Sequence, residues 1–109
     1  FLNKLSLIDM KKVDILFLKD LPNLSSLTLT NSKVERENML SIFNLIECLA
    51  IDNTDIKDVS FLNEMNKLKV LIIDSNLYEN NKKLINSLIK RNVCVLENGI
   101  HNLSYGELR

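Results

Sequence analysis

The sequence has little of what builds a chemical site or a membrane segment. Two cysteines and two glycines among 109 residues cannot supply a disulfide framework, a cysteine-based metal site or a glycine-rich phosphate loop. Lys and Arg together number 14, as do Asp and Glu, and this zero net charge makes nucleic acid a poor partner. No apolar run is longer than that of residues 70–73, which is far shorter than the about 20 residues of a membrane-spanning helix. We therefore expect one domain over residues 1–109, with no cofactor, metal, small-molecule substrate, nucleic acid or membrane insertion.

What the sequence does have is a repeat with a 22-residue period. Pairs of apolar residues separated by one position recur at this spacing without an insertion, as Leu5 and Leu7, Leu27 and Leu29, Leu49 and Ile51, Leu71 and Ile73, and Val93 and Val95. A fixed period of this length is typical of proteins built from stacked, similar units. Residues 5–7, 27–29, 49–51, 71–73 and 93–95 should therefore be consecutive neighbours in one parallel sheet. Apolar residues at helical spacing predict helices over residues 36–46 and about 81–91, on the other side of the units.

A second column with the same period is more polar. It holds Met10, Ser32, Thr54, Asn76 and Asn98. A polar side chain turned inward at this position can bond the backbone groups at each bend and link one unit to the next. Ser32 and Thr54 can do part of this, whereas Met10 cannot.

The combined pattern resembles the leucine-rich repeat, in the short 22-residue class found in internalin-like proteins. That class reads L-x-x-L-x-L-x-x-N-x-I-x-x-I-x-x-L-x-x-L, and the third repeat matches it with Leu49, Ile51, Thr54, Ile56, Val59, Leu62, Met65 and Leu68. The resemblance covers essentially the whole chain. It departs from the pattern at Met10, Lys12 and Glu37, and in the fourth repeat at Asn81, Ser87 and Lys90.

This resemblance implies an α/β fold, a right-handed solenoid in a horseshoe arc. Five parallel strands would line the concave face, with short helices and turns on the convex face. Solenoids need polar caps on their end repeats. Because the chain opens and stops inside a repeat, we expect residues 1–109 to be an excerpt of about five repeats from a longer protein.

Alternate strand residues should form ladders on the concave face. The first strands place mainly polar residues there, whereas the later strands place apolar residues beside two carboxylates. The predicted partner-binding residues are Cys48, Ala50, Asp52, Val70, Ile72, Asp74, Cys94 and Leu96, with Ile72 at the centre. An exposed apolar patch usually marks a partner surface. The alternative is that a neighbouring protein segment covers this end of the sheet.

Other candidate sites are weaker. Asp52 and Asp74 fall in one ladder and could share a proton or a cation, although a solvated pair is the simpler interpretation. His101 and Cys94 have no third group to orient them as a catalytic dyad. The basic residues of the fourth repeat, Lys82, Lys83, Lys90 and Arg91, fit a solvated helix face.

The function that these observations favour is non-catalytic protein–protein recognition. The alternative is a structural or regulatory leucine-rich segment that positions another domain of a larger protein, such as an enzyme, a bacterial effector or a surface protein. Cys48 and Cys94 should lie two strands apart, about 10 Å by strand spacing, which exceeds the roughly 7 Å limit for a disulfide. Two reduced thiols favour a cytoplasmic location over secretion or the cell surface.

Overall fold

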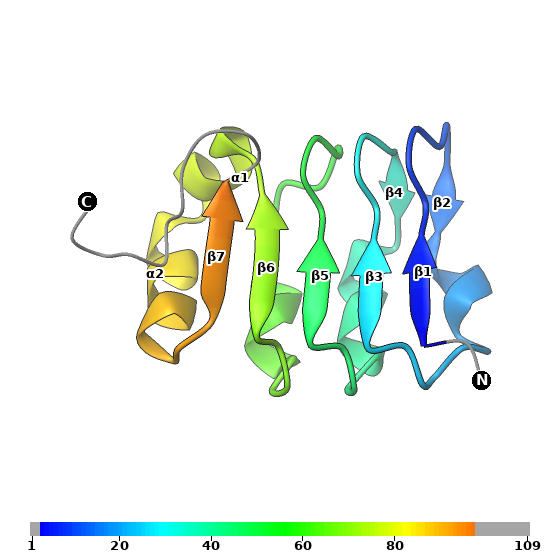
Figure 1. Ribbon diagram of the computed structural model, residues 1–109. Helices are drawn as coiled ribbons and strands as arrows, with labels where there is room; N and C mark the ends of the chain where they lie inside the picture. The colour runs from blue at the N-terminus through cyan, green and yellow to red at the C-terminus, as the bar shows by residue number, and fades with distance from the viewer. Residues whose placement is uncertain (1–2, 98–109) are drawn as a thin grey trace.

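The structure, a computed structural model, describes residues 3–97 and has an α/β fold with an open, five-stranded parallel sheet. The strands stand side by side in chain order (Figure 1). They are β1 (Lys4–Ser6), β3 (Ser26–Thr28), β5 (Cys48–Ala50), β6 (Val70–Ile73) and β7 (Cys94–Glu97). Each neighbouring pair is parallel, which confirms the predicted sheet.

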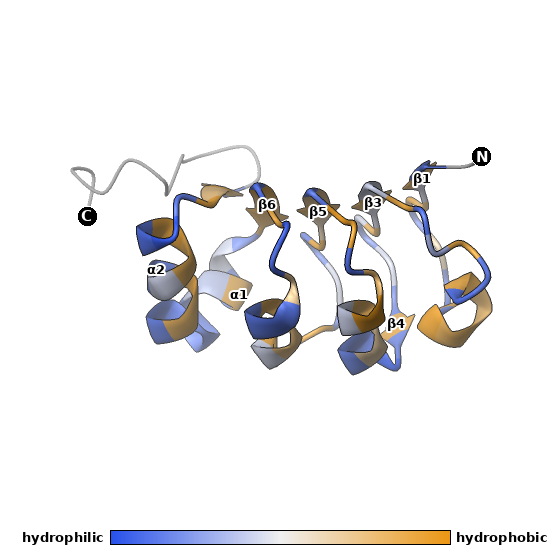
Figure 2. Cartoon of the chain, turned by 90° about the horizontal axis from the view of Figure 1, so that it is seen from below, coloured by the Kyte–Doolittle hydropathy of each residue, from blue (hydrophilic) through white to orange (hydrophobic). Residues whose placement is uncertain are grey.

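Each connection between neighbouring strands carries short helices on one side of the sheet. The first three connections contain 3₁₀-helices η1 (Ile15–Leu18), η2 (Glu37–Ile42) and η3 (Ser60–Glu64), and the fourth contains α1 (Ser75–Asn80) and α2 (Lys82–Lys90). Two short strands, β2 (Val13–Asp14) and β4 (Val34–Glu35), form a second parallel pair. Figure 2 shows these helices on one side of the sheet. We call the face turned away from them the outer sheet face.

A strand and the connection that follows it make one unit. Units 1 to 4 comprise residues 4–25, 26–47, 48–69 and 70–93. Apolar residues in the strands, or directly after them, form the centre of the core on the side of the helices. Seven of them are 0% exposed: Leu27, Leu29, Leu49, Ile51, Leu71, Ile73 and Val95. One unit is too thin to bury its own apolar residues, so they are buried only where the neighbouring unit packs against them.

The strand register follows the 22-residue period through the first four strands and then changes. Leu5 pairs with Leu27, Leu27 with Leu49, and Leu49 with Leu71. Leu71, however, pairs with Val95 rather than with Val93, the residue that the period places beside it. The predicted pairing of residues 71–73 with 93–95 is therefore wrong by two positions, because the α-helical fourth connection holds more residues than the others. An even shift leaves each side chain on its expected face of the sheet.

Both predicted helices are present, but the first is shorter than expected and is a 3₁₀-helix. The helix expected over residues 36–46 is the six-residue 3₁₀-helix η2, whereas the helix expected over 81–91 is α2. Helix α1 and the β2–β4 pair were not predicted. The third unit matches its pattern closely, since its predicted apolar residues from Leu49 to Leu68 are all buried.

The polar column is confirmed at two positions. The Ser32 hydroxyl, in a residue 4% exposed, accepts a hydrogen bond from the Met10 amide at 3.0 Å and so links units 1 and 2. The Thr54 hydroxyl donates to the Ile51 carbonyl at 2.9 Å within its own unit. Asn76 does not join the column, because it lies exposed in α1. Asn98 lies outside the described residues.

Candidate functional site

The outer sheet face carries two ladders of side chains whose order differs from the prediction at β7. One ladder runs Lys4, Ser26, Cys48, Val70, Cys94, and the next runs Ser6, Thr28, Ala50, Ile72, Leu96. The prediction placed Cys94 beside Ile72 and Leu96 one ladder further along. The two-residue shift instead places Cys94 beside Val70 and Leu96 beside Ile72.

The shift makes the expected patch more compact and more apolar at its centre. We define the apolar patch as Cys48, Val70, Ile72, Cys94 and Leu96, all of them half-buried on strands β5 to β7. Ala50 shares the ladder of Ile72 but is only 4% exposed, so it offers little surface. The first two strands place Lys4, Ser6, Ser26 and Thr28 on the same face. The face is therefore polar at one end and apolar at the other.

Asp52 is not a surface carboxylate. It is 2% exposed, and its Oδ1 accepts a hydrogen bond from the Thr30 hydroxyl at 2.9 Å. Its backbone carbonyl accepts the Asn31 amide at 3.1 Å. Asp52 is thus an acceptor within the protein and cannot form a charged rim for a partner.

Asp74 is held by two backbone amides. Its Oδ1 accepts from the amide of Leu77 at 2.9 Å, as the N-cap of α1, and its Oδ2 accepts from the amide of Asn53 at 2.5 Å. Asp52 and Asp74 therefore accept these hydrogen bonds from separate donors. Among residues 3–97, no group of three or more His, Cys, Asp or Glu side chains could hold a metal ion.

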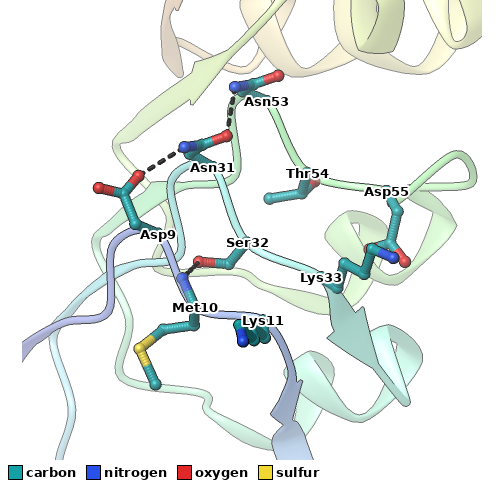
Figure 3. A pocket seen from close by; sticks show the side chains of 9 residues that line it. All are labelled: Asp9, Met10, Lys11, Asn31, Ser32, Lys33, Asn53, Thr54 and Asp55. Carbon is teal, nitrogen blue, oxygen red and sulfur yellow. Dashed lines mark hydrogen bonds between the residues drawn. The ribbon is translucent and has the colours of Figure 1, made fainter.

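A ladder that the sequence analysis missed lies one position before the predicted polar column. Asp9, Asn31 and Asn53 follow one another at the repeat period, with φ values of 61°, 54° and 55°. Asn and Asp tolerate this left-handed conformation better than other non-glycine residues. The Asn31 amide nitrogen donates to Asp9 Oδ1 at 2.5 Å, and the Asn53 amide nitrogen donates to Asn31 Oδ1 at 2.7 Å (Figure 3). The signal in the sequence was this run of Asx residues at the repeat period.

Asp9, Asn31 and Asn53, which we call the Asx ladder, border an open hollow of about 420 Å³ at the end of the strands. Its other lining residues are Met10, Lys11, Ser32, Lys33, Thr54 and Asp55 (Figure 3). The Asp55 carboxylate accepts a hydrogen bond from the Val34 amide at 2.8 Å, so it occupies the free edge of β4. These side chains mainly bond each other and the backbone, as expected for groups that hold the bends together.

Two ion pairs shift the pKa of one of their members. The hydrogen bond from Arg36 lowers the pKa of Asp14, helped by the amide of Leu16, although partial desolvation works against it. Glu79 lies 3.0 Å from the Lys82 ammonium and raises the pKa of that lysine. Lys83, Lys90 and Arg91 are exposed around α2. This arrangement fits the solvated helix face that the sequence suggested.

Cys48 and Cys94 do not form a disulfide, as predicted, and lie on either side of Val70 in one ladder. His101 lies outside the described residues, so the structure does not place the His101–Cys94 pair. Within residues 3–97, no helix is long and apolar enough to cross a bilayer.

No protein-family model matches the chain, and no curated protein does either.

Proposed function

We propose that this chain is part of a leucine-rich-repeat solenoid and acts as a non-catalytic protein-recognition module. The solenoid interpretation is supported by the 22-residue strand register of the first four strands. It is also supported by side-chain columns with the same period, such as Asp9, Asn31 and Asn53. In this arrangement the outer sheet face is the concave face of the arc.

The observation that carries the functional proposal is the apolar patch. Its five side chains remain half-buried on a sheet face from which all the described helices are turned away (Figure 2). An apolar patch on an ordered sheet binds with little loss of conformational entropy, because the side chains already stand in a fixed array. Ile72 is the central residue, since the register holds it between Ala50 and Leu96.

The carboxylates have a smaller part in recognition than the sequence suggested. Asp52 is buried, and both oxygens of Asp74 accept backbone hydrogen bonds. The partner is therefore recognised mainly through an apolar anchor that covers Ile72, Val70 and Leu96. Buried anchors of this kind dominate the binding energy of many protein interfaces.

Site-specific photo-crosslinking tests this proposal. A diazirine-bearing aliphatic residue in place of Ile72 should crosslink a second protein, whereas the same residue in place of Asn63, exposed on η3 on the helix side, should not. Mass spectrometry of the crosslinked peptides identifies the protein attached. Crosslinks from position 72 that all return to this chain would contradict the proposal. They would instead favour the alternative of a structural segment whose sheet face is covered from within.

A further inference from the structure

Four exposed cations lie where the chain enters β6 and β7. We call them the basic edge: Lys67, Lys69, Lys90 and Arg91. The first two lie in the turn between η3 and β6, the third ends α2, and the fourth follows it ahead of β7. The turns into β3 and β5 contain instead one cation, Lys19, and two carboxylates, Asp20 and Glu47. The edge at which the strands begin is therefore mixed in charge beside units 1 and 2 and basic beside units 3 and 4.

The basic edge borders the apolar patch. Lys69 directly precedes Val70, and Val70 pairs with Cys94 in the register of β6 and β7. The Cys94 amide donates to the Lys69 carbonyl at 2.8 Å, so the turn into β6 contacts the start of β7. Figure 2 looks at this edge and shows hydrophilic segments where the chain enters β6 and where it leaves α2. A partner that covers Val70 and Ile72 therefore reaches the cations of the basic edge.

The protein itself does little to neutralise these cations. Lys69 lies 3.9 Å from Glu47, and the two side chains are 72% and 50% exposed, so water screens this pair. None of the ion pairs within residues 3–97 involves Lys67, Lys90 or Arg91. The negative end of the α2 dipole accounts for Lys90 and Arg91. It does not account for Lys67 and Lys69, which lie beyond the end of a short 3₁₀-helix.

The exposure of this surface does not depend on the ends of the chain. Lys67 and Lys69 belong to unit 3, which has described units on both sides. Val70 and Ile72 stand on β6, which pairs with β5 along one edge and with β7 along the other. The cations and the apolar side chains are therefore accessible on interior units of the stack.

The two aspartates at the opposite border of the patch bond donors of the protein itself. Asp52 follows β5 and is buried beside the Thr30 hydroxyl. Asp74 follows β6, and both of its oxygens accept backbone amides. A partner anchored on Ile72 thus meets exposed positive charge on one side and carboxylates already bonded on the other. Negative charge on the first side of the partner complements this arrangement.

We propose that the partner of the apolar patch is an acidic protein segment, with an aliphatic anchor over Val70 and Ile72 and with Asp or Glu residues beside Lys67 and Lys69. This inference rests on the proposed function, because it names the kind of partner that the patch takes. The aliphatic anchor supplies most of the binding energy. The opposite charges at the rim speed association and fix the orientation, so the acidic side of the segment lies at the edge where the strands begin.

The chemistry of this surface fits protein carboxylates better than other anions. The apolar patch has no aromatic side chain on which a nucleic acid base could stack. Its side chains are half-buried on a sheet and do not protrude far enough to enter a bilayer. Three of the four cations are lysines, which act as point charges rather than as the bidentate fork with which Arg selects phosphate.

Selection from a random peptide library displayed on phage, with the whole chain as the target, tests the proposal. Enriched peptides should carry Asp or Glu on one side of an aliphatic residue. Their dissociation constant should rise as the ionic strength increases from about 0.05 M to about 0.5 M, because salt screens exposed charges. Ile72→Ser, which removes the anchor contact without adding a charge, should weaken the binding of each enriched peptide at least about tenfold.

Charge reversal locates the acidic side of the bound peptide. The double variant Lys67→Glu/Lys69→Glu should lower the association rate constant of an enriched peptide at least about tenfold and reduce its salt dependence. The matched control is Lys11→Glu/Lys33→Glu, which makes the same change of net charge at exposed lysines beside the hollow at the other end of the strands. The control should change the rate constant less than about twofold. Circular dichroism of each variant checks that the fold is intact.

Several outcomes would overturn the inference. Enrichment of basic or uncharged peptides that still require Ile72 would do so and leave the proposed function standing. The same holds for an association rate constant that Lys67→Glu/Lys69→Glu leaves unchanged, because the acidic residues then bind elsewhere. Acidic peptides that bind Ile72→Ser as tightly as the unmodified chain would overturn both proposals, as would a library that yields no peptide dependent on Ile72. Binding to vesicles of anionic phospholipid in place of any peptide would assign the surface to a membrane.

Discussion

Units 1 to 3 and unit 4 connect neighbouring parallel strands with different numbers of residues. Each must carry the chain from the end of one strand to the start of the next along the opposite layer. Units 1 to 3 do so with one 3₁₀-helix each and keep neighbouring strands at the 22-residue period. Unit 4 uses α1 and α2 and places Val95 beside Leu71, two positions beyond that period. An α-helix rises about 1.5 Å per residue and a 3₁₀-helix about 2.0 Å, so an α-helical connection of similar length holds more residues.

The change from 3₁₀-helices to α-helices in unit 4 leaves the same residues on the outer sheet face. The shift is by an even number of positions, so the residues that point outward in β7 are the ones that the strict period places there. Their neighbours change, however. Leu96 rather than Cys94 stands beside Ile72, and this makes the centre of the apolar patch more apolar.

The substitutions with the largest expected effect on stability test whether unit 4 packs as closely as units 1 to 3, whose strands keep the 22-residue period. Leu27→Ala, between regular units, and Leu71→Ala, at the change of register, both remove a 0% exposed side chain. Each should lower the free energy of unfolding by roughly 2–5 kcal/mol in chemical denaturation. Thr28→Ala, on the outer sheet face, should have almost no effect. A much smaller loss for Leu71→Ala than for Leu27→Ala would mean that unit 4 stacks loosely.

Two substitutions with a smaller expected effect on stability compare the aspartates at the start of α1 and ahead of η3. Asp74 caps α1 through the Leu77 amide and also binds the Asn53 amide, so Asp74→Ala should cost about 1–2 kcal/mol of stability. Asp58 is exposed and accepts the Ser60 amide at 2.9 Å, ahead of η3. Asp58→Ala should therefore cost less, about 0.5 kcal/mol. Equal losses by thermal unfolding would contradict the special role of Asp74 in joining units 3 and 4.

The smallest expected effects concern two ion pairs: Asp14–Arg36, which joins units 1 and 2, and Glu79–Lys82, which lies inside unit 4. The folded-state pKa of Asp14 lies below its ordinary 3.8, so its pairing with Arg36 stabilises the fold fully above that pH and is lost as pH falls through the lowered pKa. The folded-state pKa of Lys82 lies above 10.5, so its pairing with Glu79 acts fully below that pH and is lost as pH rises through the raised pKa. In NMR titrations, Arg36→Gln should raise the pKa of Asp14, and Glu79→Gln should lower the pKa of Lys82. Unchanged values would show that neither pair forms in solution.

The sequence predicted most of the sheet because one column of apolar residues carries the period. Leu5, Leu27, Leu49 and Leu71 pair in the expected register, and the predicted apolar residues of unit 3 are all buried. The register of β7 could not be read in the same way. Val93 and Val95 are both apolar at strand spacing, so either could stand beside Leu71. The departures at Asn81, Ser87 and Lys90 marked the unit in which the period fails.

The candidate site was predicted less well than the fold, because side-chain hydrogen bonds are not visible in a hydrophobic pattern. The apolar residues Val70, Ile72 and Leu96 lie on the expected face. The roles of Asp52 and Asp74 depend on Thr30, Asn53 and Leu77, donors that only the folded chain brings to them. Recognition of a protein partner through the patch stays a proposal.

The most direct test of that proposal is Ile72→Glu, measured for both thermal stability and binding of the protein that crosslinks to position 72. Ile72 points away from the core, so the midpoint of thermal unfolding should stay within about 2 °C of the unmodified chain. Binding should weaken by at least about a hundredfold, as for the loss of a central apolar anchor. Unfolding of Ile72→Glu with no partner present would instead make Ile72 an internal contact, and that result would contradict recognition through the outer sheet face.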